Sequence, residues 1–290
     1  MFKDIKQVMK DSVLYGIGNV AVKLVGFILI PLYTDAEYFS TADYGLMGLL
    51  EVTSQILIAV MGLSLYSGLI RWYWDAEYRD KQKTIFFTTL LFTILTSLCI
   101  GSVLWLNVGE LSALLVQQEG YSLGGELPYI LQLLILTSML GAVVEVPQNL
   151  LRLQRKPIYY SLTNIVRLFA TLVLTIYFTI SLHRGVSGVY EAQLVGIVIQ
   201  LLMVLPLVIK NSSCRVDRKC TIQLLAYSYP LVFPAIVGSL LTVFDRYIIN
   251  HFQGLDDVGF YSLGYKVGNT LKVFIVTSVQ LALTPLLMKK

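Results

Sequence analysis

The sequence contains little charge for its length of 290 residues, and this scarcity limits the kind of protein it can encode. Only 14% of the residues are Asp, Glu, Lys or Arg, whereas a soluble domain usually has about 25%. Hydrophobic residues make up 56%, and the mean hydropathy is +0.71. A chain with so few charges could not cover the surface of a water-soluble domain. The composition therefore indicates a membrane protein, and we expect no nucleic-acid partner.

Cysteine is also rare. Of the three cysteines, Cys99 lies in an apolar run, while Cys214 and Cys220 are spaced differently from the ligands of a usual zinc site. We interpret all three as free thiols. The sequence therefore predicts no disulfide framework, no metal site and no cofactor.

Long apolar runs are what the sequence does have. A helix needs about 20 apolar residues to cross a bilayer, and irregular backbone is too costly in lipid to replace a helix there. The predicted fold class is therefore an all-α polytopic membrane protein with about eight transmembrane helices. The runs cover residues 12–34, 44–68, 84–108, 128–150, 158–181, 188–209, 222–248 and 258–287.

Lysine and arginine concentrate on one side of the predicted membrane, and basic connections usually stay in the cytoplasm. The other side has only Arg184 and Arg246. We therefore predict a multi-pass protein with both termini in the cytoplasm. The basic side holds Lys3, Lys6, Lys10, Arg71, Arg79, Lys81, Lys83, Arg152, Arg155, Lys156, Lys210, Arg215, Arg218, Lys219, Lys289 and Lys290.

Two stretches of the chain resemble each other, "ADYGLMGLLEV" from residue 42 and "DDVGFYSLGYKV" from residue 256. A shift of 214 positions aligns Asp43 with Asp257 and Gly45 with Gly259 without a gap. The shift also brings the first two predicted spans onto the last two, so the repeat contains six spans and both copies have the same orientation. Parallel repeats of this kind are typical of secondary transporters, which bind their substrate between the two halves.

The repeat divides the chain into a complete six-helix lobe, residues 1–215, and the first two helices of a second lobe, residues 216–290. A symmetrical molecule would need about four further spans, so we expect the second lobe to be incomplete at Lys290. The alternative is a complete eight-span protein in which the repeat is a coincidence.

The chain resembles the Wzx-type polysaccharide and O-antigen flippases, which are polysaccharide biosynthesis proteins of a MOP/MATE-like superfamily. Three passages carry the resemblance and are similar to the opening, the loop after the second span and the passage from span 7 to span 8 of these proteins. They are "YGIGNVAVKLVGFILIPLYTDAEYFSTADYGLMGLLE", "LIRWYWDAEYRDKQK" and "SYPLVFPAIVGSLLTVFDRYIINHFQGLDDVGFYSLGYKVGN".

This resemblance implies a protein of the bacterial inner membrane that moves undecaprenyl-pyrophosphate-linked oligosaccharide to the outer leaflet. The glycan would serve O-antigen, capsule or exopolysaccharide assembly, and movement would occur by alternating access through a central cavity between two six-helix lobes. The implied partners are the lipid-linked oligosaccharide, membrane lipids, and other polysaccharide-assembly proteins or a separate C-terminal half.

Flipping breaks no covalent bond, so we expect no catalytic residues and look instead for ionisable groups inside spans, which are costly and mark functional sites. Arg167 is the sharpest candidate contact for a diphosphate, because its fork can donate two parallel hydrogen bonds. Polar residues accompany the basic ones on the same helix faces. The predicted cationic cavity is formed by Lys23 with Asn19, by Arg167 with Asn164 and Thr171, and by Lys266, Lys272 and Asn269.

Two acidic residues also lie inside predicted spans, Glu51 in the second and Glu145 in the fourth. Either could couple transport to an ion. Alternatively, each could form an ion pair that holds helices together, for example between Glu51 and Lys23, and would then bind no substrate.

The sequence leaves several functions open beside the flippase. A cation-coupled multidrug exporter of the same superfamily would favour acids in the cavity, whereas the charges near mid-span are mostly basic. A truncated gene would give an inactive product or half-transporter. A membrane glycan polymerase or acyltransferase is disfavoured, because the only histidines, His183 and His251, lie near the predicted outer surface and no large external loop is predicted.

Overall fold

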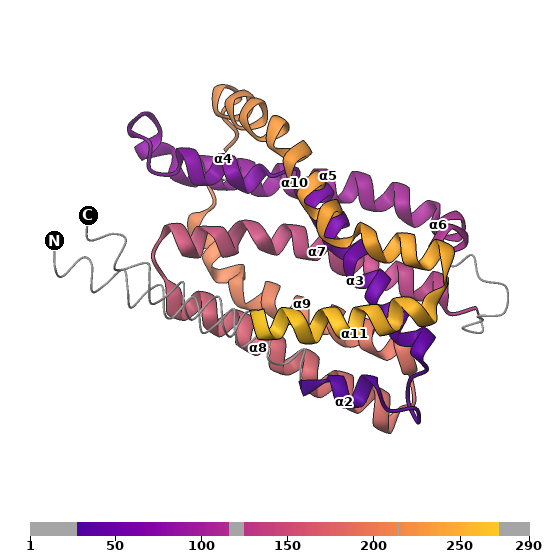
Figure 1. The fold of residues 1–290 in the computed structure, drawn as a ribbon. Helices are drawn as coiled ribbons and strands as arrows, with labels where there is room; N and C mark the ends of the chain where they lie inside the picture. The colour runs from indigo at the N-terminus through magenta and orange to yellow at the C-terminus, as the bar shows by residue number, and fades with distance from the viewer. Residues whose placement is uncertain (1–27, 116–124, 214, 273–290) are drawn as a thin grey trace, which may run out of the picture.

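The computed structural model describes residues 28–115, 125–213 and 215–272, and every regular element in these ranges is a helix (Figure 1). The elements are α2 (Ile30–Tyr33), α3 (Thr41–Gly62), α4 (Leu65–Trp72), η1 (Ala76–Lys81), α5 (Gln82–Leu106), α6 (Val108–Leu115), α7 (Leu127–Leu153), α8 (Pro157–Ile176), η2 (Tyr177–Ser181), α9 (Gly185–Asn211), α10 (Arg218–Phe252) and α11 (Leu255–Lys272).

The predicted all-helical membrane architecture is confirmed. Among the described residues, six helical segments are long and apolar enough to cross a membrane, and they correspond to the second to seventh predicted spans. The first predicted span, 12–34, and the eighth, 258–287, extend into residues outside the described ranges. The six segments are Thr41–Gly62, Tyr78–Leu106, Leu127–Leu153, Pro157–Ser181, Gly185–Asn211 and Arg218–Leu241.

The second predicted span, residues 44–68, is wrong as a single helix. The helix stops at Gly62 and restarts at Leu65, because Leu63 and Ser64 adopt the left-handed conformation with φ of 45° and 50°. This conformation costs an L-residue about 1–2 kcal/mol. Apolar residues continue through the interruption, so hydropathy alone could not reveal it.

α7 lies at the centre of the bundle and packs against α3, α5 and α9. Its side chains Ile130, Leu134 and Ile135 are buried in the main hydrophobic core. By contrast, α5 leaves Leu98 and Leu106 exposed on its outer face. Exposed apolar side chains on a long apolar helix are what a bilayer as solvent requires.

The connections α4–α5, α7–α8 and α9–α10 gather at one end of the molecule, on the left in Figure 1. Gln154, in the α7–α8 connection, contacts the other two connections. Its amide nitrogen donates to Tyr73 Oη, just after α4, at 3.0 Å and to Asn211 Oδ1, at the end of α9, at 2.9 Å. Lys81 and Asp217 form an ion pair across the same end. The basic connections that predicted the cytoplasmic side therefore do lie together.

At the opposite end, α3 crosses α11 with almost no space between the two main chains. A Cβ atom added to Gly45 would lie 1.9 Å from the carbonyl oxygen of Leu255, and one added to Gly259 would lie 2.5 Å from that of Thr41. Only glycine allows so close an approach. The contact is reciprocal, because the shift that aligns Gly45 with Gly259 also aligns Thr41 with Leu255. The two repeat-related segments therefore pack on each other as equivalents.

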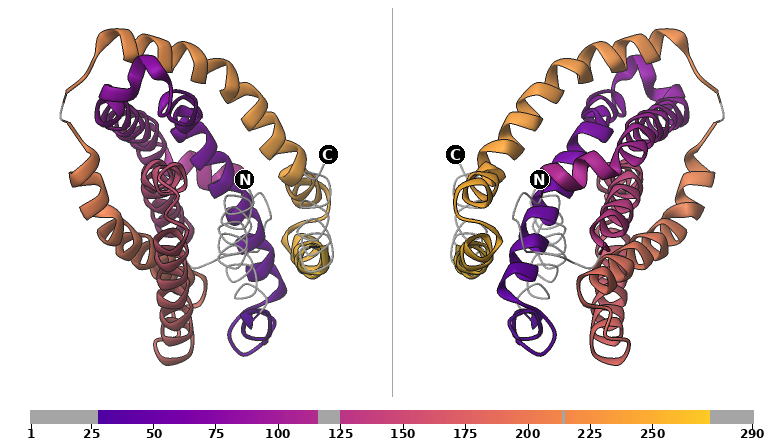
Figure 2. Two further views of the ribbon diagram at one scale, coloured as in Figure 1. Left: turned by 90° about the vertical axis from the view of Figure 1, so that its left-hand side faces the viewer. Right: turned by 90° about the vertical axis from the view of Figure 1, so that its right-hand side faces the viewer.

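α10 connects the two ends. It has 35 residues and contains Pro230 and Pro234, and it arches over the other helices from α4 to α11 (Figure 2). Hydrogen bonds attach it to the first lobe along its length. Ser64 Oγ donates to the Leu231 carbonyl at 3.4 Å, the hydroxyls of Thr53 and Tyr247 lie 2.7 Å apart, and Asn250 Nδ2 donates to the Leu115 carbonyl at 2.9 Å.

Candidate functional site

A cluster of cations and tyrosines lies where α3 approaches α11. The ammonium group of Lys266 on α11 lies 5.7 Å from the ring centre of Tyr33 and 5.9 Å from that of Tyr44. A cation within about 6 Å of an aromatic face is attracted by the negative ring quadrupole. Lys266 is a predicted residue of the cationic cavity, and the structure places its ammonium group beside tyrosines of α2 and α3.

Arg246 on α10 is the second cation of this cluster, and the sequence analysis did not select it. Its side chain is only 8% exposed, and its guanidinium carbon lies 4.9 Å from the ring centre of Tyr265. Its Nε has no hydrogen-bond partner in the described structure. The signal was present, because Arg246 falls inside the predicted span 222–248, but we had counted it with the outer connections.

We refer to Lys266, Arg246, Tyr33, Tyr44 and Tyr265 as the cation–tyrosine cluster. Ammonium and guanidinium groups can donate hydrogen bonds to phosphate oxygens. Tyrosine rings supply a rigid apolar surface with a polar tip, which can contact a ring-shaped polar ligand on its less polar face. The cluster therefore suits a ligand that carries both negative charge and cyclic polar groups.

The polar stripe predicted on α8 forms a network with α9. Arg167 donates from Nη1 to Gln200 Oε1 at 3.1 Å, and Gln200 Nε2 donates to Asn164 Oδ1 at 2.9 Å. Thr171 also faces α9, since its Oγ1 would lie 2.1 Å from a Cβ added to Gly196 on that helix. The structure thus brings three predicted residues together and adds Gln200, which the sequence analysis missed. Whether the network contacts a substrate stays a prediction.

For the remaining predicted residues of the cationic cavity, the structure gives no contact with the cation–tyrosine cluster. Asn269 lies on α11 and is exposed. Lys272 is the last residue of α11, and its side chain lies outside the described part of the structure. Lys23 and Asn19 both lie outside the described residues, so the structure neither joins them to the cluster nor separates them from it.

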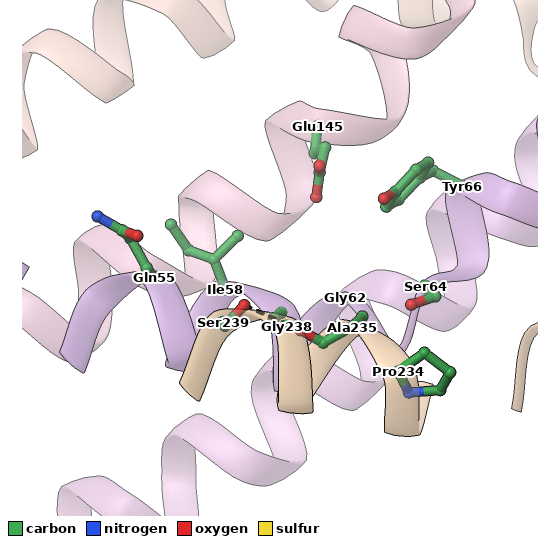
Figure 3. Close-up of a pocket in the computed structure, with 11 residues that line it drawn as sticks. Gln55, Ile58, Gly62, Ser64, Tyr66, Glu145, Pro234, Ala235, Gly238 and Ser239 are labelled. Atoms are coloured by element: carbon green, nitrogen blue, oxygen red, sulfur yellow. Dashed lines mark hydrogen bonds between the residues drawn. The ribbon is translucent and has the colours of Figure 1, made fainter. Parts of the chain in front are cut away.

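A cavity of about 490 Å³ lies between the first lobe and α10, around the interruption that separates α3 from α4 (Figure 3). Figure 3 shows the Glu145 carboxylate directed from α7 into this cavity. Glu145 is the only charged residue among the described residues that line the cavity. The lining consists of Gln55, Ile58, Ala59, Gly62, Ser64, Tyr66, Glu145, Pro234, Ala235, Gly238 and Ser239.

The cation–tyrosine cluster and the cavity are separate along α3. Tyr44 belongs to the cluster and Gln55 is the cavity-lining residue of α3 nearest to it, so about 16 Å of helix lies between them at 1.5 Å per residue. Glu51 lies between these two positions and its side chain is exposed. No described ion pair involves Glu51, and its proposed pairing with Lys23 involves a residue outside the described ranges.

Comparison with known proteins places this arrangement in a family. Residues 8–290 match the model of a family described as "Polysaccharide biosynthesis protein". A search of curated protein sequences finds no match.

Solved structures with a similar fold include transporters. A structure of the MATE multidrug transporter DinF-BH matches with a TM-score of 0.75 at 15% identity, over 97% of this chain and 64% of that one. A MATE transporter in complex with MaL6 gives 0.71 at 17% identity, over 92% and 61% of the two chains.

A third similar structure is a MOP superfamily transporter from Pyrococcus furiosus, described as having a binding pocket of reversed polarity, and it gives a TM-score of 0.66 at 16% identity. The match covers 91% of this chain and 61% of that one. The chain therefore spans less than two thirds of the length of these solved structures, and at these identities the likeness establishes the fold alone.

Proposed function

Because the chain belongs to the polysaccharide biosynthesis protein family and has the MATE-like membrane transporter fold, we propose that it serves as a flippase for undecaprenyl-pyrophosphate-linked oligosaccharide. The protein would act in the bacterial inner membrane during O-antigen, capsule or exopolysaccharide assembly. Its termini would be cytoplasmic, and its partners would be membrane lipids and other assembly proteins or a separate C-terminal half.

The observation that carries this proposal is the cation–tyrosine cluster. A lipid-linked oligosaccharide presents a diphosphate beside sugar rings. The cluster likewise places two cations beside tyrosine rings, and its residues come from α2, α3, α10 and α11. Charge-assisted hydrogen bonds to phosphate are the strong contacts of such sites. The repeat predicts that residues 216–290 begin a second lobe, and the cluster would then lie between two lobes, where repeat-built transporters bind their substrates.

The test is glycan export from a bacterium that depends on this protein. Lys266→Ala should reduce export about ten- to hundredfold, because a hydrogen bond to a charged group contributes about 1.5–3 kcal/mol. Surface glycan would be measured together with lipid-linked oligosaccharide retained inside the cell. Lys83→Ala is the matched control, since Lys83 is an exposed basic residue at the other end of the molecule, and it should export normally. Normal export by Lys266→Ala at equal membrane abundance would refute the proposal.

A cation-coupled multidrug exporter is the second candidate, and one observation favours it. The charge that lines the cavity among the described residues is the acid Glu145 rather than a base, which suits a cationic compound. Accumulation of a cationic dye in cells with and without the protein separates the two functions. Dye efflux without any change in surface glycan would favour the exporter.

A further inference from the structure

Two neighbouring residues of α10, Asp245 and Arg246, carry opposite charges but do not pair with each other. Among the described residues, no ion pair joins their side chains. The Asp245 carboxylate is instead hydrogen-bonded through both oxygens. Oδ1 accepts from the Arg246 main-chain amide at 2.9 Å, and Oδ2 accepts from the hydroxyl of Tyr261 on α11. Opposite charges attract strongly in a site of low dielectric, so this separation needs a structural cause.

Two tyrosines of α11 hold these side chains apart. Tyr261 binds the acid, whereas the ring centre of Tyr265 lies 4.9 Å from the guanidinium carbon of the base, Arg246. Residues four positions apart lie on the same face of a helix. The two tyrosine rings also stack on each other, with 6.2 Å between their centres and an interplanar angle of 29°. They therefore form one surface that contacts the acid at one position and the base at the other.

The separation leaves Arg246 without a neutralising partner in the described structure. Its side chain is only 8% exposed, and its buried Nε makes no hydrogen bond there. Glu51 on α3 is a second acid in this region and acts electrostatically on Tyr33 and Tyr44, but it forms no described ion pair with Arg246. A buried, unpaired charge is costly for the fold. Its retention here therefore suits the binding of an anionic ligand.

We infer that Tyr261 is a positioning residue of the cation–tyrosine cluster, which holds the Asp245 carboxylate away from Arg246 so that the guanidinium can bind a phosphate. Without the Tyr261 hydroxyl, Asp245 Oδ2 loses its hydrogen bond and can turn toward Arg246 instead. One of the two cations of the cluster would then be neutralised. The ligand is the diphosphate of the proposed function, on which this role of Tyr261 rests.

The first experiment measures surface glycan and retained lipid-linked oligosaccharide in a bacterium that depends on this protein. Tyr261→Phe should reduce export about tenfold, which corresponds to 1.4 kcal/mol, at equal membrane abundance. The double variant with Asp245→Asn should recover most of the export, because an amide has no charge with which to neutralise Arg246. Tyr129→Phe is the matched control, since it also removes a tyrosine hydroxyl that donates to a carboxylate, that of Glu191, and it should export normally.

The double variant distinguishes positioning from a purely structural link between α10 and α11. Asp245→Asn cannot restore a lost structural hydrogen bond, so a double variant as defective as Tyr261→Phe would overturn the inference. Normal export by Tyr261→Phe, together with lost export by Lys266→Ala, would reject the role of Tyr261 and leave the proposed function standing. Normal export by both single variants would reject both.

A second measurement uses the purified full chain in detergent and does not depend on transport. Inorganic pyrophosphate should raise the unfolding temperature of the wild type, as expected for a ligand that binds only the folded state, and the shift should be smaller in Tyr261→Phe. Equal shifts in these two proteins, or no shift in the wild type, would overturn the inference.

Asp245→Asn alone keeps the test decisive if Tyr261→Phe does not fold. This variant removes a negative charge beside the anion site while Tyr261 remains. It should therefore bind pyrophosphate more tightly than the wild type, as measured by a larger shift of the unfolding temperature. Equal or weaker binding would overturn the inference.

Discussion

Helices α10 and α11 contact the rest of the molecule at two ends, α4–α10 and α3–α11, and the atoms that form the contact differ between them. Where α3 crosses α11, main chain meets main chain, and a Cβ atom on Gly45 would lie 1.9 Å from the Leu255 carbonyl oxygen. Where α4 meets α10, side chains make the contact. A Cβ atom on Gly68 would lie 3.0 Å from Ser228 Oγ, and the Arg71 guanidinium stacks 4.9 Å from the ring centre of Tyr227.

This difference determines how each end can respond to change. A side chain can rotate to another rotamer and leave the helices in place, whereas two touching main chains can separate only if a whole helix moves. The α3–α11 end is therefore the more sensitive to added volume. The α4–α10 end tolerates small adjustments, and its strength depends on several weak contacts.

The largest effect is expected from filling the main-chain contact. Gly45→Ala and Gly259→Ala should each destabilise the protein by about 3 kcal/mol, because the added carbon overlaps a carbonyl group that cannot move alone. Thermal unfolding of the purified protein in detergent would measure this loss. Gly264→Ala is the matched control on α11, since nothing lies within 4 Å of its Cβ position, and it should be neutral or stabilising. Equal unfolding temperatures for Gly259→Ala and Gly264→Ala would contradict the close crossing.

An intermediate effect is expected at the opposite end. Gly68→Ala places its Cβ against Ser228 Oγ and Leu224 Cγ, which are side-chain atoms that can adjust by a few tenths of an ångström. We expect a loss of about 1 kcal/mol or less, measured in the same unfolding assay. A cost as large as that of Gly45→Ala would show that both ends are equally rigid and would remove the distinction.

The smallest effect is expected from the ion pair at the α4–α10 end. The hydrogen bond from Lys81 lowers the pKa of Asp217, so the pair stabilises the fold above the ordinary aspartate pKa of about 3.9 and loses this contribution as the pH falls through the lowered value. Wild type should therefore lose slightly more stability than Lys81→Ala between about pH 5 and pH 2.

The pair is exposed, and exposed pairs contribute little. Lys83→Ala, which removes a neighbouring exposed lysine, should show the acid dependence of the wild type. Identical acid profiles for wild type and Lys81→Ala would mean that the pair has no role in closing this end.

The sequence predicts the helical spans well because hydropathy over a long window is a strong signal. The predicted span 128–150 lies within Leu127–Leu153, and 188–209 lies within Gly185–Asn211. The left-handed residues Leu63 and Ser64 escape this kind of analysis, since their backbone conformation is imposed by packing and neither residue type favours it.

The site was harder to predict than the fold, because a residue's depth in a span does not tell which neighbour it faces. Arg167 and Asn164 share a helix face as predicted, but their common partner Gln200 comes from another helix. Arg246 was not selected as a site residue, because a basic residue near the end of a span reads equally well as a topology signal. Glu145 was selected for its charge inside a predicted span, and only the structure shows that it lines the cavity beside α10.

The length of α10 has a consequence of its own. A 35-residue helix extends for about 52 Å if straight, whereas the hydrocarbon layer is about 30 Å thick. Tyr78 donates a hydrogen bond to Gln223 near its start and Ser64 donates to the Leu231 carbonyl further along, while others anchor it near its end at Tyr247 and Asn250. Inserting one residue between these anchors would turn the far end by about 100° and displace it by about 1.5 Å. The position and orientation of the far end of α10 therefore depend on the number of residues between the anchors more than on the identity of most of them.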